Sequence, residues 1–166
     1  MNTTTTMKTT FNNSRLSTKE SKAENKAAAL KHLKSRAKDF IFYMNEGEDE
    51  DSVQDPEKWL KKAEKLGLCP FYQYGLSFDY VAPGTFTDNK KGYWRHQLSC
   101  GGPSEEIRFF GDHNFGKVYK IEFVYLEWGT GCGIDVTNED WAKWLWDLFS
   151  EFGSLEAEYD KALTEA

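Results

Sequence analysis

The spacing of apolar residues changes from a helical period to a strand period near residue 71, and it changes back near residue 137. Over residues 72–80, aromatic and aliphatic side chains occupy every second position, which is the pattern of a half-buried strand. The same alternation predicts further strands at 93–100, 105–110 and 117–128, and a short fifth strand at 133–136. Because Gly-rich turns separate these segments, we expect an antiparallel meander of four to five strands.

Helical patterns flank this block on both sides. Ser17 and Glu20 form a capping box that predicts a helix start, and Asp55 before Pro56 predicts a second one that Gly67 ends. Each outer helix has one apolar stripe: Leu30, Leu33, Ala37, Phe40, Ile41 and Met44 in the first, and Trp141, Trp144, Leu145, Leu148, Phe149 and Phe152 in the last. These elements predict an α+β fold, with N-terminal helices and one C-terminal helix packed on one face of the sheet.

The chain of 166 residues is the length of a single domain. Residues 1–16 are rich in Thr and Asn and contain few large apolar groups, so we expect a disordered tail there. A single α+β domain is expected over 17–166, and we divide it into a helical part at 17–67, a sheet at 71–136, a helix at 137–153 and a polar tail at 154–166.

A net charge of −6 argues against non-specific binding to nucleic acid or to an anionic membrane, since both need a basic protein surface. The three cysteines are scattered, so neither a disulfide framework nor a cysteine-rich metal site is expected. The start of the chain lacks the apolar core of a signal peptide. We therefore expect a cytoplasmic protein without a cofactor or a bound metal.

Gly111–Val118 comes within one residue of a phosphate-binding P-loop, but Val118 replaces the hydroxyl residue that would hold magnesium. The residues that follow have a strand pattern, so no helix N-terminus is expected to receive a phosphate. We interpret this stretch as a hairpin loop. The glycines at 129, 131 and 133 likewise do not fit the dinucleotide pattern and are interpreted as a turn.

An acidic run forms the connection between the first two helices. Its members are Glu46, Glu48, Asp49, Glu50 and Asp51. The run lacks the ligand spacing of a calcium-binding EF-hand loop. It is therefore interpreted as a solvated loop, with the alternative that these carboxylates meet basic residues of a partner.

Histidine and cysteine side chains give no clear catalytic pair. His96 and Cys100 share one face of a predicted strand, but residues four apart are about 13 Å from each other, so both are expected to face the core. His32 is expected to face solvent. Asp112 and His113 lie in a loop and are the candidate acid and base of a small enzyme or ligand-binding protein, with its site between loops 82–92 and 111–116.

A partner-binding surface is predicted on the sheet face opposite Trp94 and His96. Its members are Tyr93, Arg95 and Gln97, together with Arg108, Lys120 and Glu122, which we interpret as a cross-strand charge set. Trp146 points about 120° from the centre of its helix's apolar stripe and is added to this surface. Tyrosine and arginine are typical of binding hot spots, although single surface aromatics are also common.

Four stretches in the C-terminal half, YGLSFDYV, QLSCGGPSEEIRFF, YKIEFVYLEW and GSLEAEYDKA, resemble small acidic proteins carried by phages and plasmids. The resemblance implies a compact accessory protein of a mobile element that inhibits a host defence or nucleic-acid-processing protein. A non-catalytic protein-binding module is thus the leading hypothesis. Its partner would present a basic surface, direct nucleic-acid binding is the weakest hypothesis, and the first helix could support a homodimer.

Overall fold

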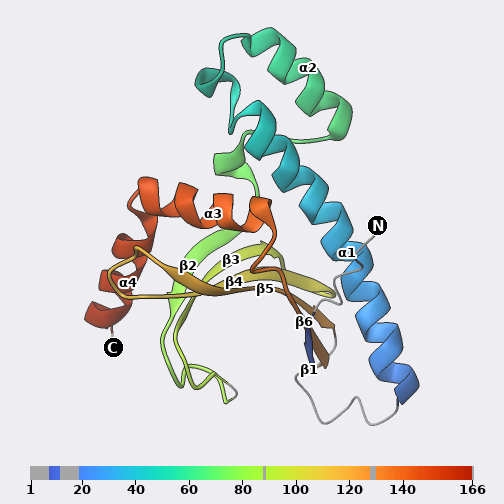
Figure 1. The fold of residues 1–166 in the computed structure, drawn as a ribbon, viewed down its shortest axis with the longest axis vertical. Coiled ribbons are helices and arrows are strands. Elements are labelled where there is room, and N and C mark those ends of the chain that lie inside the picture. The colour runs from blue at the N-terminus through green and yellow to red at the C-terminus, as the bar shows by residue number, and fades with distance from the viewer. Residues whose placement is uncertain (1–7, 12–18, 88, 128–129, 166) are drawn as a thin grey trace.

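The computed structural model describes residues 8–11, 19–87, 89–127 and 130–165. Its centre is an antiparallel sheet of six strands in the order β1-β6-β5-β4-β3-β2 (Figure 1). The strands are β1 (Thr9–Phe11), β2 (Ser77–Val81), β3 (Tyr93–Ser99), β4 (Ser104–Gly111), β5 (Val118–Glu127) and β6 (Thr130–Asp135). Strands β2 to β6 follow one another as neighbours and form the predicted meander, while β1 pairs with β6 at the far edge.

The hairpin between β4 and β5 confirms the interpretation of the P-loop-like stretch. The Asp112 amide donates to the Lys117 carbonyl at 2.8 Å and closes the loop, and β5 begins directly afterwards at Val118. A strand therefore occupies the position where a P-loop needs a helix N-terminus.

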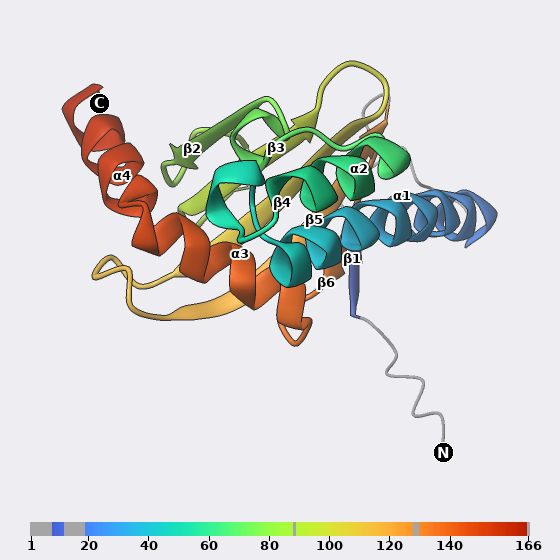
Figure 2. The ribbon, with the colours of Figure 1, turned by 90° about the horizontal axis from the view of Figure 1, so that it is seen from above.

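Helices cover one face of the sheet, as predicted. They are α1 (Lys19–Glu46), α2 (Pro56–Leu66), α3 (Asp140–Glu151) and α4 (Ser154–Glu165). Helix α3 crosses the sheet, α1 runs along its β6 side, and α4 packs beside β2 (Figures 1 and 2). Helix α2 folds back near the C-terminal end of α1, where the Trp59 indole donates to the Gly47 carbonyl at 3.0 Å.

The core is a layer of aromatic and aliphatic side chains between the helices and this face. Phe40 of α1 stacks on Trp141 of α3 with ring centres 5.2 Å apart, and both are buried in the core. The strands contribute completely buried side chains, including Ile107, Phe109, Ile121, Phe123 and Ile134. The expected stripe of α1 enters this layer only in part, because Leu33 and Phe40 are buried whereas Leu30 and Ile41 remain exposed.

Several predicted boundaries differ from the structure. The fifth strand starts at Thr130 instead of Gly133, so Gly131 and Gly133, which were interpreted as part of a turn, lie inside β6. The first strand of the meander starts at Ser77 instead of Tyr72, because residues 71–73 form a short 3₁₀ turn, η2 (Phe71–Gln73), and Gly75 has φ +88°. The predicted polar tail at 154–166 contains helix α4, which starts after a left-handed Gly153. In the predicted disordered tail, Thr9–Phe11 forms β1, and the other tail residues lie outside the described residues except Lys8, whose carbonyl accepts from Asp135 N.

Trp146 was wrongly predicted to leave the core, since only 3% of it is exposed. Its ring packs against Trp94 and Phe109 of the sheet, at centroid distances of 5.4 and 6.1 Å. Gly111 makes room for it, because a Cβ there would lie 2.5 Å from the end of the indole ring. Helix α3 is buried along more of its circumference than a single apolar stripe suggests.

Cys100, expected in the core, is exposed because β3 ends before it.

We expect Trp146→Ala to lower the free energy of unfolding by about 3–5 kcal/mol, because it removes a large buried ring and leaves a cavity. Urea denaturation followed by circular dichroism measures this loss. Phe152→Ala, also near the end of α3 but at an exposed residue, is the control and should change stability by about 0.5 kcal/mol or less. Equal effects of the two substitutions would contradict the buried position of Trp146.

Candidate partner-binding pocket

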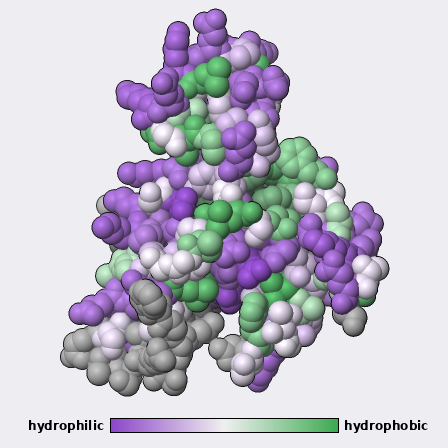
Figure 3. All heavy atoms as spheres, turned by 180° about the vertical axis from the view of Figure 1, so that it is seen from behind, coloured by the Kyte–Doolittle hydropathy of each residue, from purple (hydrophilic) through white to green (hydrophobic). Residues whose placement is uncertain are grey.

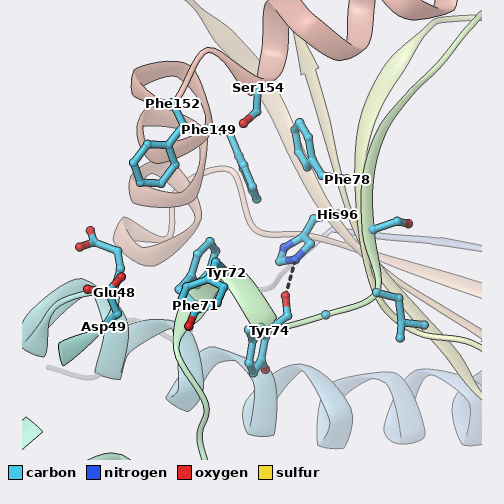
Figure 4. A pocket seen from close by; sticks show the side chains of 13 residues that line it. Glu48, Asp49, Phe71, Tyr72, Tyr74, Phe78, His96, Phe149, Phe152 and Ser154 are labelled. Atoms are coloured by element: carbon cyan, nitrogen blue, oxygen red, sulfur yellow. Dashed lines mark hydrogen bonds between the residues drawn. The ribbon is translucent and has the colours of Figure 1, made fainter. Parts of the chain in front are cut away.

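A pocket of about 310 Å³ opens at the edge of the helix layer that covers the sheet. It lies between η2, the start of β2 and the junction of α3 with α4 (Figure 4). We call it the aromatic pocket. Its lining residues are Glu48, Asp49, Phe71, Tyr72, Tyr74, Gly75, Leu76, Ser77, Phe78, His96, Phe149, Phe152 and Ser154. These residues come from four separate segments of the chain, so the pocket forms only in the folded protein.

Phenylalanine rings form the walls of the aromatic pocket. Phe78 of β2 and Phe149 of α3 are stacked with centroids 3.9 Å apart and ring planes 17° apart. Phe71 of η2 lies 6.0 Å from Phe149 and closes the wall on the side of α1. Because these rings also contact the main core, the wall is held in place before any ligand binds.

His96 lies at the inner end of the aromatic pocket, on the core face of β3 as predicted (Figure 4). Its Nε2 is 3.2 Å from the Tyr74 carbonyl. A carbonyl only accepts hydrogen bonds, so Nε2 carries the proton and Nδ1 is left with a lone pair. Nδ1 has no hydrogen-bond partner among the described residues. Burial lowers the pKa of His96 to about 4, so the ring is neutral near pH 7.

Exposed apolar side chains surround the mouth of the aromatic pocket. Tyr72, Leu76 and Phe152 are 73%, 57% and 66% exposed. Viewed from behind, apolar side chains gather on the surface at the height of α3, below the polar end formed by α1 and α2 (Figure 3). Such grouping of large apolar residues around a hollow is typical of interaction sites.

The predicted acidic run forms one side of this mouth through Glu48 and Asp49 (Figure 4). Asp49 is partly engaged, since its Oδ1 accepts from the amides of Asp51 and Ser52 and caps the short helix η1 (Glu50–Ser52). Glu46 points elsewhere and pairs with Lys62. For the Glu48 carboxylate, the described residues include no ion-pair partner, although its backbone carbonyl accepts from Phe71 N at 2.8 Å.

The other predicted surface, on the sheet face away from the helices, consists of internally paired charges. Arg95 binds both carboxylate oxygens of Asp79, at 2.9 and 2.6 Å, and Lys120 binds Glu122 at 3.0 Å. Arg108 pairs with Glu106 and its guanidinium covers the Tyr93 ring at 4.8 Å. Gln97 meets Ser77 across the sheet at 3.5 Å.

Tyr93 is consequently only 1% exposed and cannot act as the exposed anchor that the sequence suggested. The neighbouring charges already have partners, so a ligand would have to break ion pairs in order to use them. These residues do share one face, as predicted, but they lie away from the aromatic pocket, on the opposite side of the sheet from His96.

A second polar cluster, missed by the sequence analysis, joins α1 to the sheet. Glu105 accepts from Arg36 at 2.6 Å and from Ser99 at 3.0 Å, and lies 3.0 Å from His32 Nδ1. Arg36 also donates to the Tyr74 hydroxyl, which in turn donates to Asp39. Burial would raise the pKa of Glu105, but these bonds outweigh it and lower that pKa. His32 is therefore a contact to the sheet, contrary to its predicted solvent position.

The alternative site at loops 82–92 and 111–116 does not coincide with the aromatic pocket. His113 lies edge-on against Tyr159 of α4, with ring centres 4.7 Å apart. Loop 111–116 is thus held against α4, and neither Asp112 nor His113 lines the pocket.

Comparisons with protein-family models, with curated proteins and with solved structures give no significant match. The resemblance to phage and plasmid proteins stays a prediction. Among the described residues, no group of three or more His, Cys, Asp and Glu side chains is arranged to hold a metal ion. None of the helices in the described ranges is long and apolar enough to cross a membrane.

Sequence reasoning found part of this site. It identified Glu48 and Asp49 as candidates and placed His96 in the core, but it assigned Phe149 and Phe152 to one buried stripe. The available signal was Gly153 directly after Phe152, because a left-handed glycine ends a helix and so places Phe152 at the end of α3.

We expect the stability of the protein to fall as the pH decreases from 6.5 to 4. His96 has a folded-state pKa of about 4 and an ordinary value of 6.5, so the unfolded chain takes up its proton first. Keeping His96 neutral thus adds about 3 kcal/mol to the free energy of unfolding above pH 6.5, and this contribution is lost toward pH 4. Urea denaturation at a series of pH values measures it.

Carboxylates also titrate toward the lower end of this pH range. The contribution of His96 is therefore measured as the difference in pH dependence of stability between the unmodified protein and a His96 variant. His96→Phe should remove most of the fall between pH 6.5 and 5, whereas His113→Gln should keep it. An unchanged pH profile in His96→Phe would show that His96 is not buried as described.

Proposed function

We propose that this chain is a non-catalytic protein-binding module that holds part of a partner in the aromatic pocket. The observation that carries the proposal is the combination of a preformed cavity of about 310 Å³ with three exposed apolar side chains at its mouth, Tyr72, Leu76 and Phe152. Exposed side chains of this size are costly in water, and a partner that covers them regains that free energy.

The rigidity of the wall supports binding by docking. Phe78, Phe149 and His96 are fixed by the sheet and by α3, so little conformational entropy is lost when a partner enters. Binding hot spots are also enriched in aromatic residues and lie in well-packed, desolvated pockets.

The charge of the site indicates what kind of partner fits. The acidic run lies beside the aromatic pocket, and the whole chain has a net charge of −6. A partner with a basic surface, such as a protein that itself binds nucleic acid, would be attracted by this field. The activity that best agrees with these features is inhibition of a host defence or nucleic-acid-processing protein by steric and electrostatic blocking.

The polar groups of the aromatic pocket favour binding over catalysis. His96 is the titratable group at its inner end, and its Nε2 proton is held by the Tyr74 carbonyl. A general base needs a free nitrogen within reach of a substrate proton, and Nδ1 is covered by the surrounding rings. The small-enzyme alternative would have to use Asp112 and His113, where the packing of His113 on Tyr159 restricts access.

Site-specific photo-crosslinking in bacterial cells tests this proposal. A photoreactive phenylalanine analogue in place of Tyr72 or Phe152 should give one discrete crosslinked protein, and the same analogue in place of Phe86 should not. Phe86 is the matched control, because it is similarly exposed but lies in the loop between β2 and β3. The purified partner should lose activity when titrated with the unmodified chain at a one-to-one ratio.

Two results would oppose the proposal. One is the absence of any adduct from the pocket positions. The other is an adduct that forms equally well from the Phe86 control position.

A further inference from the structure

We infer that the aromatic pocket recognises a specific chemical pair on its partner: an aromatic side chain next to a lysine or arginine. The ring enters the open space beside Phe71, Phe78 and Phe149, and the cation meets the Glu48 carboxylate at the mouth. This inference rests on the proposed function, because it specifies the part of the partner that the module holds.

The size of the aromatic pocket selects one side chain rather than a whole secondary-structure element. A volume of about 310 Å³ is at the lower end of the range for ligand cavities. An α-helix is about 10 Å across with its side chains, so it does not fit inside. A single ring that projects from an extended segment fits, and the segment itself would rest on Tyr72, Leu76 and Phe152.

The walls favour a flat ring over a branched aliphatic side chain. Phe78 and Phe149 are nearly parallel, while His96 meets Phe149 edge-on at 76° with centroids 5.2 Å apart. Aromatic pairs prefer offset-stacked or edge-to-face arrangements. An entering ring finds both kinds of surface within the same cavity.

The charge at the mouth selects a cation beside this ring. Glu46 is occupied by Lys62, and one oxygen of Asp49 is occupied by backbone amides, but the described residues give Glu48 no ion-pair partner. Figure 4 shows Glu48 and Asp49 on the side of the pocket away from Phe78. His96 is neutral and adds no positive charge that would offset them. An arginine could also stack on the exposed Tyr72 ring.

Short peptides test this recognition with the full-length chain. Three acetylated and amidated tripeptides, Arg-Trp-Arg, Glu-Trp-Glu and Arg-Ala-Arg, are titrated into isotope-labelled protein and followed by NMR. We expect Arg-Trp-Arg to shift the Leu76 methyl and His96 ring signals. Its dissociation constant should be about tenfold lower than that of either other peptide, since each of those lacks one half of the pair.

Two substitutions separate the role of Glu48 from general electrostatics. Glu48→Gln should weaken Arg-Trp-Arg binding about fivefold and reduce its dependence on salt. Glu57→Gln removes the same charge from the exposed start of α2 and should leave binding unchanged. Phe152→Ala, which removes part of the mouth, should weaken all peptides that contain tryptophan.

The inference is overturned if the three peptides bind equally or if Glu48→Gln has no effect. It is also overturned if sedimentation shows a dimer that Phe152→Ala dissociates, because a second copy of this chain then covers the mouth. The outcome is separable from that of the crosslinking experiment. A partner crosslinked at Phe152 without any preference for Arg-Trp-Arg would keep the proposed function and reject the aromatic–cation pair.

Discussion

The aromatic layer between the helices and one face of the sheet is the constraint on which the rest of this structure depends. Rings from α1, α3 and β3 bury one another, as in the stack of Phe40 on Trp141 and the packing of Trp94 on Trp146. Since this layer must be kept from water, α1, α3 and α4 all lie on the same side of the sheet. The positions of the helices therefore follow from where the large rings are.

The aromatic pocket is the place where this cover is incomplete. Helix α3 ends near Phe152, the chain bends at Gly153, which has φ +68°, and α4 continues toward β2. The 3₁₀ turn η2 approaches from the other side, and between them the rings of Phe71, Phe78 and Phe149 are left with open space beside them. The same side chains thus stabilise the core and form the surface that we propose for binding.

Charged residues have different structural roles on the two faces of the sheet. On the helix side, Glu105 is buried and is compensated by Ser99 of β3 and by Arg36 and His32 of α1. The contacts from Arg36 and His32 hold α1 against the sheet. On the opposite side, each arginine or lysine has an acidic partner on the same or a neighbouring strand, such as Arg95 with Asp79. This internal pairing makes the face polar without helices over it, and it leaves Glu48 as the more available carboxylate at the proposed site.

The sequence by itself determined the α+β class, the antiparallel meander, the hairpin at Gly111–Gly116 and the acidic connection after α1, because each depends on local spacing or turn chemistry. Only the tertiary structure decided that Trp146 is buried, that Tyr93 lies under Arg108, and that Glu48 and Phe152 line the same pocket. Periodicity indicates which way a side chain points within its own helix or strand. What it meets there depends on segments that are distant in sequence, and the aromatic pocket exists only once they have packed together.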